Sequence, residues 1–132
     1  MAHSGRAGPI LWHTRQEYVE RTLRVLEVLA ERYGRYDCLV GLSTLNEPDD
    51  YRHVTEIPRP VLKDFWEEAY RRMRRHLDPD RISVVVDGHF VGADWIDFMQ
   101  PSEFSNVVVD RHLYSACEIG RPLPNHFPLA LA

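Results

Sequence analysis

The sequence predicts an α/β protein in which parallel strands form a sheet and helices pack over it. Two long segments show apolar residues at helical spacing, and three short runs rich in apolar and β-branched residues alternate with them. The order is helix, strand, helix, strand, short helix, strand. Because the strand segments are apolar at nearly every position, they are typical of parallel strands buried on both faces.

The first helix is expected from Gln16 to Tyr33, and Gly34 supplies its C-terminal stop. The first strand then follows over residues 38–45, which read CLVGLSTL. The inward stripe of this helix is predicted to be Val19, Leu23, Leu26, Ala30 and Tyr33.

The second helix is expected from about Val61 to Leu77, with Pro60 near its first turn. The aromatic residues of its stripe suggest a ligand-binding box, but at this spacing a packing face is the better interpretation. Two further strands are expected at Ile82–Val86 and Asn106–Val109, with a short amphipathic segment around Asp94–Met99 between them. The inward stripe of the helix is predicted to be Leu62, Phe65, Trp66, Ala69, Met73 and Leu77.

Length and composition favour one ordinary globular domain. The chain has 132 residues, of which 44% are hydrophobic and 27% charged, and it has no apolar run long enough to cross a membrane. A net charge of -4 argues against nucleic acid as a partner, so the basic stretch 71–75 is interpreted as a solvated helix face. We expect a folded domain over residues 1–119 and an irregular, proline-rich tail over residues 120–132.

The cysteines and the first residues bear on cellular location. Cys38 and Cys117 are the two cysteines, and each lies beside an apolar strand segment. We therefore expect both to be reduced and half-buried. Residues 1–5 lack the apolar core of a secretory signal. A cytoplasmic location is the simpler expectation.

Two of the predicted strands end alike, in Asp87-x-His89 and Asp110-x-His112. Residues two apart in a strand share a side, so these four groups gather at one end of the sheet if the strands are parallel neighbours. A hydrogen-bonded polar layer, a zinc or manganese site and a sugar site are all compatible with this cluster. No H-x-H, HExxH or paired-cysteine spacing is present, and we expect no resident metal and no cofactor.

A resemblance to a known family favours the sugar site. The segment Asn46-Glu47-Pro48 at a strand end, followed by His112-Leu113-Tyr114 at a later one, resembles glycoside hydrolase family 5, which includes cellulases and exo-β-1,3-glucanases. The likeness is greatest to the exo-β-1,3-glucanase branch and covers about residues 3–118. It implies part of a (β/α)8 TIM barrel, namely its fourth to sixth strands, and a β-glucan or β-glucoside as substrate.

The resemblance also implies roles for single residues. Glu47 matches the general acid/base, and Asn46 matches the residue that holds the sugar 2-hydroxyl. His112 and Tyr114 match a pair that hydrogen-bonds the sugar and the catalytic carboxylate. Apolar faces for stacking on a sugar ring are expected from Trp95, Trp12 or Phe90, each of which is equally compatible with core packing.

One expected partner of Glu47 has no match in the chain. A retaining glycosidase needs two carboxyl groups about 5–5.5 Å apart, and the family's nucleophilic glutamate lies on a seventh strand that is missing here. Glu118, Asp110 or Asp87 are the candidates for the second carboxylate.

A three-stranded parallel sheet has two open edges and an uncovered apolar face. Self-association is a physical remedy, so we expect a homo-oligomer in which the interface replaces the missing barrel wall. Two alternatives to a glycosidase stay open. One is a noncatalytic barrel fragment that at most binds sugars, and the other is an ester hydrolase in which His112 or His89 activates Ser115 or water.

Overall fold

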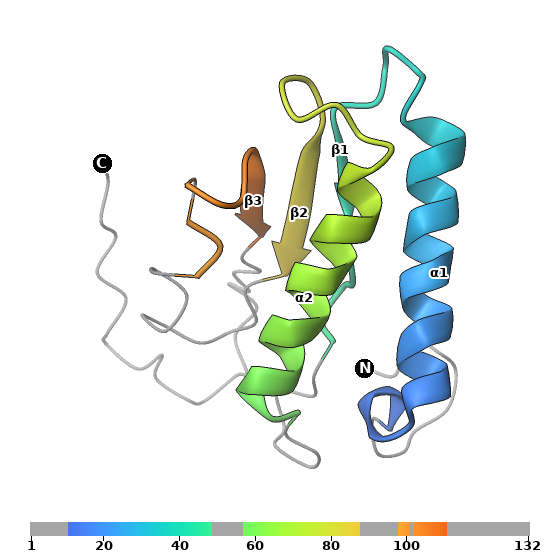
Figure 1. Ribbon diagram of the computed structural model, residues 1–132, viewed down its shortest axis with the longest axis vertical. Coiled ribbons are helices and arrows are strands. Elements are labelled where there is room, and N and C mark those ends of the chain that lie inside the picture. Colours follow the sequence, from blue (N-terminus) through green and yellow to red (C-terminus); the bar gives the residue numbers. More distant parts are fainter. Residues whose placement is uncertain (1–10, 49–56, 88–97, 101, 111–132) are drawn as a thin grey trace, which may run out of the picture.

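Three parallel strands and two long helices form the described part of the chain (Figure 1). The structure is a computed structural model, and it describes residues 11–48, 57–87, 98–100 and 102–110. The α/β class predicted from the sequence is confirmed, and the arrangement is consistent with part of a TIM barrel. The elements in chain order are η1 (Trp12–Thr14), α1 (Gln16–Tyr33), β1 (Gly41–Ser43), α2 (Arg59–Arg74), β2 (Ser83–Asp87) and β3 (Val107–Asp110).

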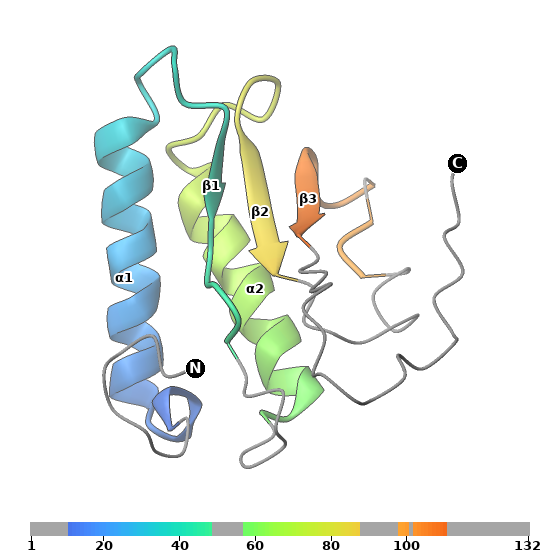
Figure 2. The same ribbon diagram turned by 180° about the vertical axis from the view of Figure 1, so that it is seen from behind.

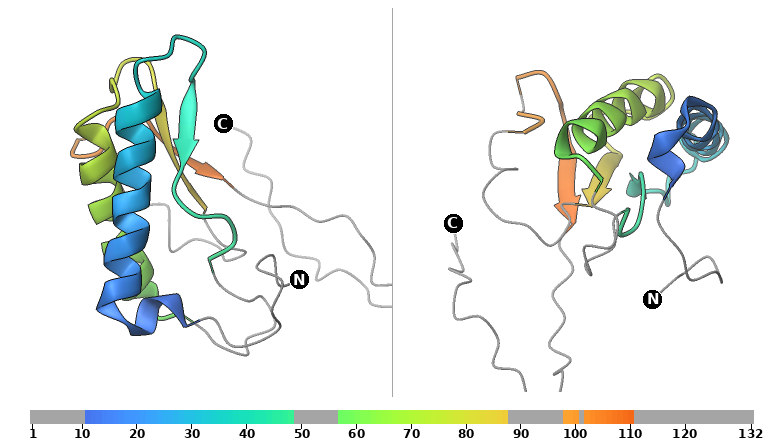
Figure 3. Two further views of the ribbon diagram at one scale, coloured as in Figure 1. Left: turned by 90° about the vertical axis from the view of Figure 1, so that its right-hand side faces the viewer. Right: turned by 90° about the horizontal axis from the view of Figure 1, so that it is seen from below.

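The sheet has the order β1-β2-β3, and both neighbouring pairs are parallel. Leu42 is in register with Val84, which is in register with Val107, and this row packs against the helices. Both helices lie on that one face of the sheet (Figure 3). Seen from behind, no described helix lies in front of the strands (Figure 2).

The core lies between the sheet and the two helices. All six residues of the stripe predicted for the second helix are buried, and Trp66, Ala69 and Met73 have no exposed surface. In α1 the predicted stripe is buried at Leu23, Leu26 and Ala30 and partly buried at Val19. The amphipathic spacing therefore identified the packing face of both helices.

The last residue of the stripe predicted for α1 is different. Tyr33 is 41% exposed, so its assignment to the core was wrong. Its ring lies 6.1 Å from that of Tyr36, in the turn that follows the helix. The aromatic ring thus packs on a neighbour in sequence and not in the core.

The first strand is shorter than predicted. The backbone N–H of Leu39 donates to the carbonyl of Tyr36 at 3.1 Å, so residues 36–39 form a turn and pairing begins with the carbonyl of Val40. Cys38 therefore lies exposed in a turn, and the expectation that it is half-buried was wrong. Val40 is 76% exposed, so this segment is not covered on both faces.

The bounds of α1 are those predicted, and the bounds of α2, β2 and β3 differ from the predicted ones by a few residues. Of the predicted amphipathic segment, residues 94–97 lie outside the described residues, and so do Cys117 and the predicted tail 120–132. No helix in the described ranges is long and apolar enough to cross a membrane.

Candidate functional site

The carboxyl ends of the three strands point to the same end of the sheet (Figure 2). Asp87 ends β2, Asp110 ends β3, and the two are in register. Asn46 and Glu47 follow β1 at the same end. The prediction that the two aspartates meet at one edge is confirmed, because their strands are parallel neighbours.

The chain leaves β1 along β2 before it turns. The backbone N–H of Thr44 donates to the carbonyl of Val85 at 2.9 Å, and the Thr44 hydroxyl donates to the same oxygen at 3.2 Å. Thr44 is buried, and a buried hydroxyl needs a hydrogen-bond partner, which the carbonyl of Val85 provides. These two bonds extend the pairing by one residue and fix where the turn begins.

Glu47 occupies the turn itself. Its φ is 45°, in the left-handed region that residues other than glycine seldom adopt. Its backbone N–H donates to Oδ2 of Asp87 at 2.5 Å. Asp87 is only 3% exposed, whereas the Glu47 side chain is half-buried and Asn46 is exposed. The turn thus places an accessible amide and a partly shielded carboxyl group side by side.

Trp12 holds the next residue of the turn. Its indole Nε1 donates to the carbonyl of Pro48 at 3.3 Å, and its ring meets that of Phe65 edge-on at 4.9 Å. The ring is partly buried against the core. Trp12 therefore packs on α2 and supports the turn, which is the core-packing alternative that its sequence context left open.

The remaining residues predicted for the site lie outside the described residues. They are His112, Tyr114, Trp95 and Glu118, together with His89, Phe90 and Ser115, on which the alternative readings depend. Of the residues predicted for the site, the structure therefore brings together Asn46, Glu47, Asp87 and Asp110. Within the described ranges, no group of three His, Cys, Asp or Glu side chains is arranged to hold a metal ion.

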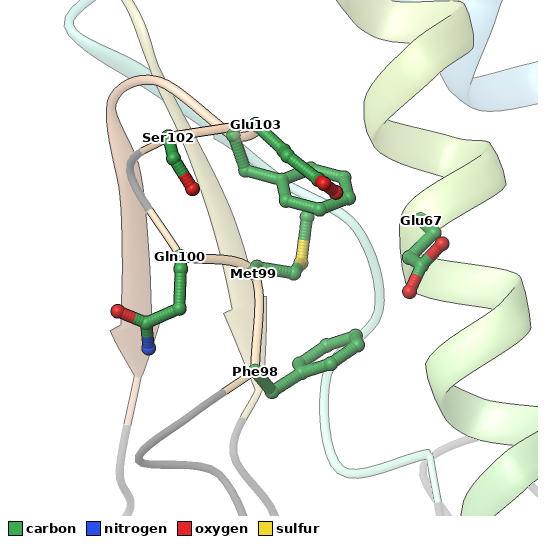
Figure 4. Close-up of a pocket in the computed structure, with 7 residues that line it drawn as sticks. Glu67, Phe98, Met99, Gln100, Ser102 and Glu103 are labelled. Carbon is green, nitrogen blue, oxygen red and sulfur yellow. The ribbon is translucent and has the colours of Figure 1, made fainter.

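A separate hollow of about 360 Å³ lies between α2 and the segment after residue 97 (Figure 4). Glu67 points toward it from α2, but that carboxylate also pairs with Arg71 at 2.8 Å. The lining contains none of the site residues predicted from the sequence, and no pattern in the sequence signalled it. The other lining residues are Phe98, Met99, Gln100, Ser102, Glu103 and Phe104.

The chain is similar in sequence to fungal glucan 1,3-beta-glucosidases. It is 32% identical over 118 residues to a probable glucan 1,3-beta-glucosidase A of Aspergillus niger, a match that covers 89% of this chain and 26% of that protein. It is 30% identical over 118 residues to a glucan 1,3-beta-glucosidase of Schwanniomyces occidentalis, covering 85% of this chain and 27% of that one. It is 25% identical over 114 residues to glucan 1,3-beta-glucosidase 3 of Schizosaccharomyces pombe, covering 85% and 22%.

These similarities support a relationship to glycoside hydrolases over a limited region. The chain spans about a quarter of the length of the curated relatives it matches. No family model matches it.

Proposed function

We propose that this chain carries the acid/base corner of a β-glucan-cleaving site of the glycoside hydrolase family 5 type, with Glu47 as the general acid/base. The observation that carries the proposal is the position of Asn46-Glu47 at the carboxyl end of a parallel strand, the edge at which TIM barrels carry their chemistry. The names of the related proteins add β-1,3-glucan as the substrate class.

The chemistry uses Glu47 twice. In its acid form the carboxyl group gives its proton to the glycosidic oxygen as the bond from that oxygen to the anomeric carbon breaks. The resulting carboxylate then takes a proton from the water that attacks the same carbon. A half-buried carboxyl group suits this cycle, because it is partly shielded from water and still accessible to substrate.

Asn46 is proposed to bind the sugar beside Glu47. Its side chain is exposed, and an amide both donates and accepts hydrogen bonds, as a sugar hydroxyl does. A contact to the 2-hydroxyl strengthens as the ring becomes an oxocarbenium ion. His112, Tyr114 and Trp95 are proposed to complete the sugar pocket.

A second carboxylate is required for a retaining mechanism. Two of the three candidates, Asp87 and Asp110, lie among the residues that the structure describes. Of these, Asp110 is exposed at the end of β3 and has an accessible carboxylate at this edge. Glu118 is the further candidate, and a composite site with a carboxylate from another subunit is the third source.

We also propose that a second copy of the chain covers the open face of the sheet. Ser43, Val85 and Val108 are in register and alternate with the residues that face the helices. Val108 is 46% exposed on the edge strand β3. Among the residues that the structure describes, nothing covers this face, and β1 and β3 each pair on one side only. Self-association would remove such a surface from water.

The test is hydrolysis of an aryl β-glucoside and of β-1,3-gluco-oligosaccharides by the parent and by Glu47→Gln. Loss of the acid/base is expected to reduce turnover on the order of 10²- to 10⁴-fold. Glu31→Gln, which removes an exposed carboxylate near the far end of α1, is the matched control and is expected to keep the parent rate.

Calorimetric titration with the same oligosaccharides separates catalysis from binding. Binding that survives in Glu47→Gln, together with lost turnover, supports the assigned role. Saturable binding by a parent that releases no product would instead indicate the noncatalytic sugar-binding fragment. Equal turnover in the parent and in Glu47→Gln would contradict the proposal.

A further inference from the structure

The turn after β1 is held at three successive points by residues from elsewhere in the chain. Thr44 is bonded to the carbonyl of Val85, the N–H of Glu47 to the carboxylate of Asp87, and the carbonyl of Pro48 to the indole of Trp12. Two of these contacts come from β2, the neighbouring strand. The turn is therefore fixed against β2 and against the helical layer at once.

The contact at Glu47 is chemically different from the other two. Its acceptor is a carboxylate with 3% exposure, and a hydrogen bond to an ionised acceptor is about twice as strong as one between neutral groups. It is also made at the residue with the left-handed φ of 45°. A strained backbone conformation persists only where its surroundings impose it, and such residues cluster at functional sites.

We propose that Asp87 is a positioning residue for Glu47 and not the second carboxylate of the reaction. By accepting the Glu47 N–H, Asp87 holds the left-handed turn, and the turn sets the direction in which the Glu47 side chain leaves the backbone. This inference rests on the proposed role of Glu47 as general acid/base.

The same geometry argues against Asp87 as a nucleophile. A carboxylate that attacks the anomeric carbon needs an accessible oxygen facing the sugar. Asp87 is nearly inaccessible, and its Oδ2 is directed to the backbone of Glu47. Asp110, its register partner on β3, ends its strand at the same level but is exposed.

The first experiment needs no substrate and reads the amide at position 47 by NMR. It uses the Glu47→Gln protein, so that the carboxyl group of Glu47 does not itself titrate. As the pH is lowered, the position-47 amide proton is expected to move upfield with the same midpoint as the side-chain carboxyl carbon of Asp87. An amide proton that does not follow Asp87 overturns the proposal.

Variants of the acceptor give the second reading. Asp87→Ala is expected to speed hydrogen exchange of the position-47 amide about tenfold or more, because a charge-assisted bond is lost. Asp87→Asn keeps an oxygen acceptor and is expected to give an intermediate rate. Asp110→Asn removes a charge at the register-matched position and is expected to leave that amide unchanged. If Asp87→Ala does not fold, the pH titration still decides.

Turnover tests the consequence for catalysis. A small displacement of a catalytic group is expected to lower kcat about 100-fold in Asp87→Ala while KM changes little, with partial recovery in Asp87→Asn. A rise in KM of similar size, without a fall in kcat, would indicate that Asp87 binds sugar and would overturn the positioning role. A parent without turnover but with the expected amide titration would reject the proposed function and keep the contact between Asp87 and Glu47.

Discussion

Gly34, at the end of α1, allows the segment that follows α2 to approach α1 closely. Its N–H donates to the carbonyl of Ala30 at 2.8 Å, and its own carbonyl accepts from Arg81 at 2.7 Å. A Cβ at this position would lie 2.5 Å from the carbonyl oxygen of His76. Its φ is -57°, so glycine is required for space and not for a left-handed conformation.

Gly34→Ala is therefore expected to destabilise the fold. The added methyl group meets backbone oxygens that cannot rotate away, and overpacking of this kind costs about 1–3 kcal/mol in the free energy of unfolding. Urea denaturation followed by circular dichroism measures the change. Gly41→Ala is the matched control, since its nearest contact would be 3.4 Å from the carbonyl oxygen of Ser83. Equal stability losses in the two variants would contradict the steric explanation.

At the scale of elements, the arginines of α2 tie the layers together. Arg72 forms a two-pronged pair with Glu20 of α1 at 2.6 and 2.9 Å and also binds Glu68. Arg75 reaches Glu27 of α1 at 3.1 Å. Arg74 donates to the carbonyl of Ile82 at 2.8 Å, on the opposite side of the helix. The basic stretch predicted as a solvated face is thus largely engaged in contacts with neighbouring elements.

These pairs make stability depend on pH in the acid range. Hydrogen bonds from Arg72 hold the pKa of Glu20 below its usual value, and those from Arg24 do the same for Glu27. Because the pKa in the folded state is lower than in the unfolded state, the stabilisation is present above about pH 4.5 and is lost as the pH falls through the folded-state pKa.

The expected result is a melting temperature that falls below about pH 4.5, and less steeply in Glu20→Gln than in the parent. Glu20 is exposed, so the effect of its pair is expected to be small and to shrink in high salt. Thermal melts across pH in low and high salt provide the measurement. Glu31→Gln, exposed on the same helix, should retain the slope of the parent; a slope flattened as in Glu20→Gln would speak against the pairs between helices.

For the whole molecule, the layer arrangement predicts association. The helices cover one face of the sheet, and the row formed by Ser43, Val85 and Val108 lies on the other. Parent protein at micromolar concentration is expected to have the mass of an oligomer in light scattering, because burying this face removes apolar surface from water.

Val108→Lys is expected to shift that mass toward the monomer, since it places a charge in the interface. Val28→Lys changes an equally small side chain that is exposed on α1, and it should leave the mass unchanged. A monomeric parent, or dissociation caused by both variants alike, would count against an interface on the sheet.

The fold could be predicted further than the site. Five of the six buried residues of α2 were predicted, because amphipathic spacing over four turns marks one packing face, and Tyr70 was missed. The bounds of β1 were overestimated because apolar residues at 38–40 match a strand pattern while the turn at Tyr36 depends on the path back from α1. Neighbouring parallel strands were enough to bring Asp87 and Asp110 together. The bond from Glu47 to Asp87 could not be predicted, because it requires the left-handed turn, which no residue type at this position signals.

The pairing register of β1 and β2 has a consequence for the quality of any preparation of this protein. A slip of two residues between these strands would keep every side chain on its own face and leave an apolar layer against the helices. It would also carry Asp87 about 6.6 Å along the sheet, out of reach of the Glu47 N–H. Molecules with the slipped register would thus have the helix content of the native fold but would lack the bond between Glu47 and Asp87. The fraction of molecules with a competent site therefore reports the fraction in which β1 and β2 pair in the native register.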